Sequence, residues 1–268
     1  MKGRKTGFFV VAALIAIVVL PAAFAPALTR YEPLEQDVSR RLLPPSREHF
    51  FGTDGFGRDV YARVLYGARI SMYVGLLSVG SSALFGIAIG VISAFYGGSL
   101  DLIIGRLTDV VLGFPYLVLA ILIIVALGSS PTAVAIAIAT VLVPRVTRMA
   151  RASALSVMEA PFISAARIVG AGRFRVIFRH LLPNCLQGPL TQITGYFGTA
   201  IATEVVLSYL GLGVPPPYSS WGRMIQEGTR LYFETAPWLV VFPSLALVIT
   251  VVGFATIGDY ARNSGVRA

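Results

Sequence analysis

The longest part of this 268-residue chain without a charged side chain is residues 110–144. As one helix this stretch would be about 50 Å long, whereas the hydrocarbon core of a bilayer is about 30 Å thick. The sequence Gly128-Ser-Ser-Pro131 supplies turn-forming residues near its middle. We therefore predict a hairpin of two membrane spans, residues 102–127 and residues 132–150.

Four further stretches have the length and composition of a membrane-spanning helix. They are residues 8–29, 70–96, 186–210 and 236–257, and only the third contains a charge, Glu204. Because an unpaired backbone amide in lipid costs several kcal/mol, such spans are helical. The sequence therefore predicts an all-α integral membrane protein with six transmembrane helices. A cleavable signal peptide is the alternative for the first stretch, but we favour a retained anchor because further spans follow.

The composition excludes a soluble or a disordered protein. Hydrophobic residues make up 56% and charged residues 13% of the chain, and the mean hydropathy is +0.76. A soluble domain carries about twice that share of charge. The net charge is +9, but the arginines lie in short segments between apolar runs, which favours loops at a lipid bilayer over a nucleic-acid interface. Lysine and arginine are more frequent on the side of the termini, which predicts both termini in the cytoplasm.

The chain lacks the residues of several common catalytic sites. No lysine follows Lys5, which excludes a phosphate-binding loop of the Walker type. The single Cys185 and the distant His49 and His180 form no cluster of metal ligands in the sequence. No nucleophile motif stands within a span. We therefore expect no enzymatic activity, no metal and no cofactor in this chain.

Two long connections, residues 30–69 and residues 145–185, link the predicted spans. We divide the chain into an N-terminal span with its external loop, residues 1–69, and a five-span core, residues 70–268. The core includes an internal loop of about residues 151–185.

Two smaller features make local predictions. Trp221 and Trp238 suit the aromatic belt at the membrane–water interface. Gly86 and Gly90 lie four residues apart, which permits two helices to approach closely, although membrane helices are rich in glycine in any case.

The internal loop has a helix–turn–helix pattern. Apolar residues recur at helical spacing in its first half, at Phe162, Ala165, Ala166 and Val169. Gly170 and Gly172 then break the helix, and a second short apolar run ends at Pro183. The pattern favours either a compact projection that fits a groove on another protein or a helical pair that lies on anionic headgroups. From the residues alone, both alternatives stay open.

Part of this loop resembles the signature of the permease subunits of ABC importers, which reads Glu-Ala-Ala, three residues, Gly, nine residues, Ile-x-Leu-Pro. The chain has Ser164-Ala-Ala-Arg-Ile-Val-Gly170, nine residues, and then His180-Leu-Leu-Pro183. Serine replaces the glutamate and histidine replaces the isoleucine. The matching residues are Ala165, Ala166, Gly170, Leu182 and Pro183.

Further motifs, in the same order along the chain, are similar to one branch of these permeases, the dipeptide/oligopeptide/nickel family. They are Phe51-Gly-Thr-Asp-Gly-Phe-Gly-Arg-Asp-Val60, Leu65-Tyr-Gly-Ala-Arg-Ile-Ser71, Leu207-Ser-Tyr-Leu-Gly-Leu-Gly-Val-Pro-Pro216, Ser220-Trp-Gly222, Ala236-Pro-Trp238 and Gly258-Asp259. The resemblance covers nearly the whole chain and is closest to the second, C-type, permease.

The resemblance implies a multi-pass subunit of an ATP-driven importer in a bacterial or archaeal plasma membrane. Its implied partners are a second, B-type, permease, two ABC ATPase subunits that bind ATP and Mg, and an extracytoplasmic substrate-binding protein. The transported solute would be a di- or oligopeptide or a related small molecule. The residues that the resemblance implies for coupling to the ATPases are Ser164, Ala165, Ala166, Arg167, Gly170, His180, Leu182 and Pro183. A stand-alone ion or solute channel is the alternative, but the chain has no internal repeat.

Glu204 carries two further hypotheses. A charge within a span costs about 2.5–3.5 kcal/mol on insertion scales and usually faces protein or water. Glu204 would either have a pathway role, in which it lines the translocation pathway or binds the amino terminus of a peptide, or serve the structure. The structural role would be an ion pair with Arg223 or Arg230, or a hydrogen bond within the helix bundle.

Overall fold

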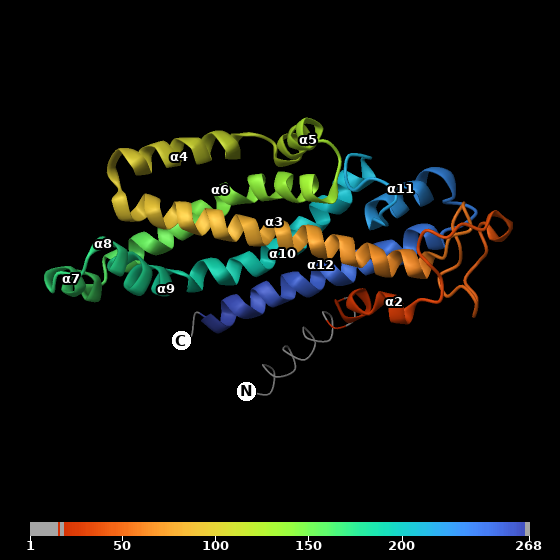
Figure 1. The fold of residues 1–268 in the computed structure, drawn as a ribbon, viewed down its shortest axis with the longest axis horizontal. Helices are drawn as coiled ribbons and strands as arrows, with labels where there is room; N and C mark the ends of the chain where they lie inside the picture. Colours follow the sequence, from red (N-terminus) through yellow and green to blue (C-terminus); the bar gives the residue numbers. More distant parts are fainter. Residues whose placement is uncertain (1–15, 17–18, 266–268) are drawn as a thin grey trace.

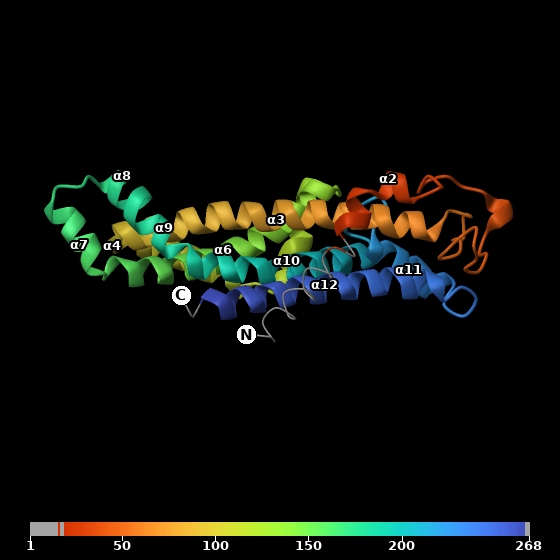
Figure 2. The same cartoon turned by 90° about the horizontal axis from the view of Figure 1, so that it is seen from below.

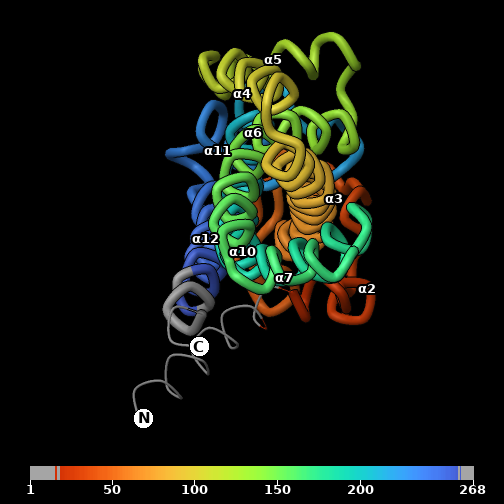
Figure 3. Tube along the Cα trace, turned by 90° about the vertical axis from the view of Figure 1, so that its left-hand side faces the viewer, coloured from red at the N-terminus to blue at the C-terminus, as the bar shows by residue number. Residues whose placement is uncertain are grey.

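Four long helices run along one axis and form the body of the molecule (Figure 1). They are α3 (Val60–Tyr96), α6 (Pro131–Met158), α10 (Gln187–Tyr209) and α12 (Trp238–Gly265). The computed structural model describes residue 16 and residues 19–265, and this part of the chain contains helices and loops but no β-strand. Seen end-on, the same four helices lie around a common centre (Figure 3).

Four of the predicted spans, the second, fourth, fifth and sixth, each largely coincide with one described helix. Helices α3, α6 and α12 have the length and apolar composition of a membrane span, and α4 (Gly98–Gly113) with α5 (Tyr116–Leu127) gives a fourth candidate. Helix α10 covers the predicted fifth span. Of the first predicted span, residues 8–29, the structure describes residue 16 and residues 19–29, which include the short α2 (Ala25–Leu28). The all-α class is confirmed, and the number of six spans stays a prediction.

The predicted third span, residues 102–127, is wrong as a single straight helix. Helices α4 and α5 are bent by 94° relative to one another. Pro115 lacks an N–H donor, and its ring disfavours a helical backbone at the residue before it. Phe114 accordingly adopts an extended conformation, with φ −79° and ψ 140°. The predicted hairpin turn is confirmed, because Gly128 has φ +81° and the Ser130 hydroxyl accepts a hydrogen bond from the Ala133 amide at the start of α6.

Helix α3 begins ten residues before the predicted span, at Val60 rather than at residue 70. Its first turn is capped by Asp59, whose carboxylate accepts a hydrogen bond of 2.7 Å from the Ala62 amide. Two arginines near its start, Arg63 and Arg69, set the predicted boundary. Arg63 forms an ion pair with a carboxylate and Arg69 donates to backbone carbonyls of the N-terminal segment, so neither interrupts the helix.

Glycine determines how closely the two central helices pack. A Cβ atom at Gly86 would lie 2.6 Å from the Val146 Cβ, and one at Gly90 would lie 2.5 Å from the Thr147 carbonyl oxygen. These distances are shorter than any normal van der Waals contact. The close helix–helix approach predicted from these two glycines is therefore observed, and the two helices that approach each other are α3 and α6.

At the end of the bundle opposite α7, residues 29–59 and the short helix α11 (Trp221–Leu231) cover the helix ends (Figures 1 and 2). Trp221 is fully buried there, and its indole N–H donates to the Val64 carbonyl at 2.9 Å. The prediction that Trp221 belongs to an interfacial belt is therefore wrong. The indole has its hydrogen-bond partner inside the protein instead of at the lipid surface.

Candidate functional site

The signature motif lies in a helical projection at one end of the molecule. Helix α6 continues to Met158, so the loop begins at residue 159 rather than near 151. We call residues 159–185 the signature loop. It contains α7 (Pro161–Ile168), and it extends beyond the ends of α3 and α4 at the left of Figures 1 and 2.

A glycine-dependent turn ends α7. The Gly170 amide donates to the Arg167 carbonyl, the Ala171 amide donates to the Ala166 carbonyl, and Gly170 has φ +85°. This pattern is the Schellman motif, which requires a left-handed residue at the first position beyond the helix. A Cβ atom at Gly170 would meet no other atom within 4 Å. The requirement for glycine is therefore one of backbone conformation and not of space.

The apolar face of α7 differs from the predicted one. Ile163 is buried against the rest of the protein, with 1% of its surface exposed. Phe162 and Val169, which were predicted to share an apolar face, are 44% and 87% exposed. Ile168 is 85% exposed as well. The side chains around the signature turn thus have no contact partner in the described part of this chain that would remove them from solvent.

The return arm of the signature loop anchors it to the bundle. It consists of α8 (Arg173–Arg175), the π-helical turn η2 (Val176–Leu181) and α9 (Leu182–Cys185). Pro183 lacks the N–H that an α-helical bond across this turn would need, and π-helical turns are frequent at functional sites. Leu181 and Cys185 pack with Ala94 of α3 and Ala154 of α6 in a separate apolar cluster. The return arm is thereby packed against the ends of two long helices.

The predicted coupling residues divide between a surface and an anchor. Arg167 lies over the Phe95 ring, 5.7 Å from its centroid, and connects α7 to the end of α3. Leu182 packs against the anchoring cluster, and His180 is half-buried. Ala166 is partly exposed. The remaining members are exposed, namely Ser164, Ala165, Gly170 and Pro183.

Two ion pairs hold α4 to α6 close to the signature loop. Arg151 donates two hydrogen bonds of 2.5 Å to the Asp101 carboxylate, which also accepts one from the Ser93 hydroxyl of α3. Arg148 pairs with Asp109. Charge neutralisation of this kind makes four charges tolerable near the bilayer.

Glu204 is fully buried near the opposite end of α10. Its carboxylate accepts hydrogen bonds from the hydroxyls of Ser71 at 3.1 Å, Ser208 at 2.8 Å and Ser220 at 3.0 Å. These serines belong to α3, to α10 and to the residue before α11. Neither Arg223 nor Arg230 forms an ion pair with it among the described residues. The contacts are those of a hydrogen bond within the bundle, one of the two hypotheses for this residue.

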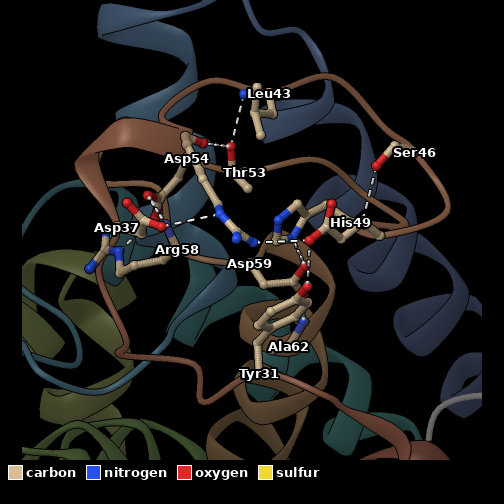
Figure 4. Close-up of polar contacts among 12 residues, drawn as sticks. Tyr31, Asp37, Leu43, Ser46, His49, Thr53, Asp54, Arg58, Asp59 and Ala62 are labelled. Atoms are coloured by element: carbon tan, nitrogen blue, oxygen red, sulfur yellow. Dashed lines mark hydrogen bonds and ion pairs between the residues drawn. The ribbon is translucent and has the colours of Figure 1, made fainter.

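Residues 30–59 form a compact polar layer, which we call the external cap after the external loop predicted from the sequence (Figure 4). Asp54 accepts hydrogen bonds from the backbone amides of Phe56 and Arg58 and forms ion pairs with the Arg58 and Arg63 side chains. The Asp59 carboxylate lies 2.9 Å from Nδ1 of the buried His49. Asp54, Arg63 and Asp59 are each at most 5% exposed. Sequence reasoning missed this network, because the partners meet only when the loop folds back on α3.

Comparisons with known proteins agree with the motifs. Residues 86–263 match the family described as "Binding-protein-dependent transport system inner membrane component". The chain is 42% identical over 251 residues to the dipeptide transport system permease protein DppC of Alkalihalophilus pseudofirmus, covering 94% of this chain and 82% of that one. It is 36% identical over 253 residues to the oligopeptide transport system permease protein OppC of Bacillus subtilis, covering 94% and 82%.

Solved structures show the same fold. A chain of the inward-facing MetNI methionine ABC transporter superposes with a TM-score of 0.63 at 16% identity, covering 76% of this chain and 96% of that chain. A chain of an amino acid ABC transporter gives a TM-score of 0.58 at 16% identity, covering 76% and 94%. The chain therefore belongs to the family of inner membrane components of binding-protein-dependent transport systems. Such a component is a multi-pass permease subunit and not itself a catalytic subunit.

Proposed function

We propose that this chain is one of two permease subunits of an ATP-driven importer of di- or oligopeptides or a related small solute. The named relatives are permeases for dipeptides and oligopeptides, at 42% and 36% identity over most of the chain. In this proposal the chain forms half of the translocation pathway with a B-type permease. Two ABC ATPases supply the energy and bind ATP and Mg, so this chain needs no cofactor. A stand-alone channel has no such support among the relatives.

The exposed turn of the signature loop carries this proposal. Ile168 and Val169 expose more than four fifths of their surface, although the two arms of the loop are held by a glycine turn and an apolar cluster. Such an apolar patch on an ordered element is typical of a protein contact. A docked ATPase subunit covers it in our proposal. The signature loop lies beyond the ends of α3 and α4, which leaves its exposed turn accessible to a second protein (Figure 2).

The anchor explains how force would reach the membrane. Leu181 and Cys185 tie the return arm to α3 and α6, and Arg167 ties α7 to the end of α3. A rigid displacement of the signature loop by closing ATPases would move both helices together. This is the kind of rigid-body switch by which transporters alternate between inward- and outward-facing states.

The two ends of the bundle then face different partners. We propose that the signature loop and both termini are cytoplasmic in a six-span topology, and that the external cap faces the substrate-binding protein. The cap exposes apolar side chains on its outer surface: Leu34, Val38, Phe50 and Phe56. The division into residues 1–69 and 70–268 belongs to the same proposal, with the cap as the external part of the first unit.

Gly170→Val tests the coupling role. Valine is strained at φ +85°, so the Schellman turn would be rebuilt and the exposed patch displaced. We expect loss of uptake and of ATPase co-purification, while the B-type permease still co-purifies. Gly172→Val is the matched control, because Gly172 is exposed and has φ −64°, and a Cβ atom added there would meet no other atom within 4 Å.

Comparison of the two glycine variants separates loss of ATPase docking from general disruption of the loop. Retained uptake and retained ATPase binding in Gly170→Val would refute the coupling role of the loop. Equal loss in both glycine variants would show that the loop tolerates no valine at all, which contradicts the specific requirement for a left-handed residue at position 170.

A further inference from the structure

Three arginines follow one another along α6 but have different surroundings. Arg148 and Arg151 are paired with Asp109 and Asp101 of α4. Arg145 is exposed and forms no ion pair or hydrogen bond with any residue in the described part of the chain. It lies 14 residues after Pro131 in a 28-residue helix, so it is about 21 Å from the helix start and about one turn before Arg148.

Arg145 lines a cavity of about 190 Å³ between α5, α6 and α10. Tyr116, Thr199 and Thr203 supply hydroxyl groups to the same cavity. The Thr203 hydroxyl already donates a hydrogen bond to the Thr199 carbonyl. Tyr116 and Thr199, in contrast, are exposed residues that line the cavity. The remaining lining residues are apolar, and no acidic residue lines the cavity in the described part of the chain. The wall therefore carries one uncompensated positive charge.

An unpaired guanidinium is costly in contact with lipid, so we expect Arg145, which lines this cavity, to face water or an anion in the assembled protein. The cavity is smaller than the roughly 300–1,000 Å³ of a complete small-molecule site. It therefore holds an end group of a solute and not a whole peptide, with the rest of the space supplied by another subunit. The forked N–H donors of a guanidinium match either a carboxylate or a phosphate, but its single positive charge balances one carboxylate and not a doubly charged phosphate.

We propose that this cavity is a carboxylate-binding station on the translocation pathway, in which Arg145 contacts the carboxylate of the solute and the Tyr116 and Thr199 hydroxyls assist. The proposal rests on the proposed transport function and adds a residue and a ligand chemistry to it. The station differs from Glu204, whose oxygens are already occupied by serine hydroxyls.

The test measures charge selectivity at the cavity without needing the natural solute. Thr199→Cys is made in a Cys185→Ala background and purified in detergent with its co-purifying subunits. Its reaction rates are measured with the anionic sulfonatoethyl and the cationic trimethylammonioethyl methanethiosulfonates, and each rate is divided by that of free cysteine. Val248→Cys is the control, since Val248 is 55% exposed in the middle of α12, away from the cavity.

We expect Thr199→Cys to favour the anionic reagent by about tenfold, the scale of one charge acting over a few ångströms in partly hydrated protein. Arg145→Gln should abolish this preference and Arg145→Lys should keep most of it. Val248→Cys should react slowly with both reagents. If Arg145→Gln does not assemble, the ratio of the two normalised rates at Thr199→Cys in the protein that retains Arg145 still tests the proposal.

No labelling at position 199, equal normalised rates, or a preference for the cationic reagent would overturn the proposal. These outcomes are distinct from failure of the transport function, which would appear as a purified chain that associates with no ATPase. If the cavity is charge-selective but the purified chain associates with no ATPase, the anion site is supported and the importer function is refuted.

Discussion

The external cap and the signature loop are connections of similar length with opposite character. In the cap, the charged side chains of Asp54 and Asp59 are buried and have partners within the chain, and the partner of Asp54 is the buried Arg63 of α3. In the signature loop, Ile168 and Val169 are apolar and exposed, with no partner within the described part of the chain. The cap is held by ion pairs and hydrogen bonds within the chain, whereas the exposed turn of the loop has no cover from the described part of the chain.

The difference indicates what each region contributes. A buried ion network holds a fixed shape, because removing one partner leaves an uncompensated charge. An exposed apolar turn adds little to stability, and a second protein must cover it to gain from it. We infer that the cap maintains the architecture of the external end, and that the loop transmits an external force. Substitutions in the two regions should therefore separate stability from coupling.

The largest loss of stability is expected from Asp54→Asn in the cap. Arg63 is 3% exposed and would keep only Glu227, at 3.6 Å, as a carboxylate partner. Breaking a buried pair costs about 3–5 kcal/mol of unfolding free energy. Thermal unfolding of the purified chain in detergent measures this loss. Asp37→Asn, which alters an exposed carboxylate of the same cap, should leave the midpoint in place, and equal shifts in both variants would contradict a buried network.

A smaller loss is expected from Asp101→Asn between α4 and α6. The bidentate contact with Arg151 becomes a neutral hydrogen bond, but the two side chains are 21% and 38% exposed, so water compensates in part. We expect a destabilisation of about 1–2 kcal/mol. A double-mutant cycle with Arg151→Gln isolates the pair, and a coupling energy near zero would show that the two side chains act independently.

The smallest change in stability is expected from Ile168→Ser in the signature loop. Surface substitutions of this kind usually alter unfolding free energy by less than about 0.5 kcal/mol. ATPase co-purification and uptake should nevertheless fall strongly, because the apolar contact is lost. Ile163→Ser is the contrasting variant, since Ile163 is 1% exposed and its replacement should lower the unfolding midpoint as well. A stable Ile168→Ser variant with normal uptake would remove this patch from the interface.

Charge-free runs predicted most helices, because lipid solvation acts on each stretch locally. Residues 132–150 and 236–257 largely coincide with α6 and α12. The failure at residues 102–127 came from giving length more weight than Pro115, whose geometry breaks the run into two helices. The early start of α3 escaped prediction because Arg63 is neutralised by Asp54, nine residues earlier in the sequence.

The site was predictable only in part. The glycine turn at Gly170 follows from a local backbone requirement, and its position was visible in the motif. Which side chain of α7 faces the protein was not, since Phe162 and Ile163 are adjacent and equally apolar, and only the packing of α7 selects Ile163. The serine partners of Glu204 come from three separate segments, so no local pattern identifies them.

Photo-cross-linking from the two exposed ends tests the central claim most directly. A photoreactive residue replaces Val169 in one variant and Phe56 in the other, in the full chain and in native membranes. We predict that position 169 forms an adduct with a nucleotide-binding subunit, and that position 56 forms none with that subunit. An adduct with lipid alone at position 169, or labelling of that position from outside the cell, would contradict the account.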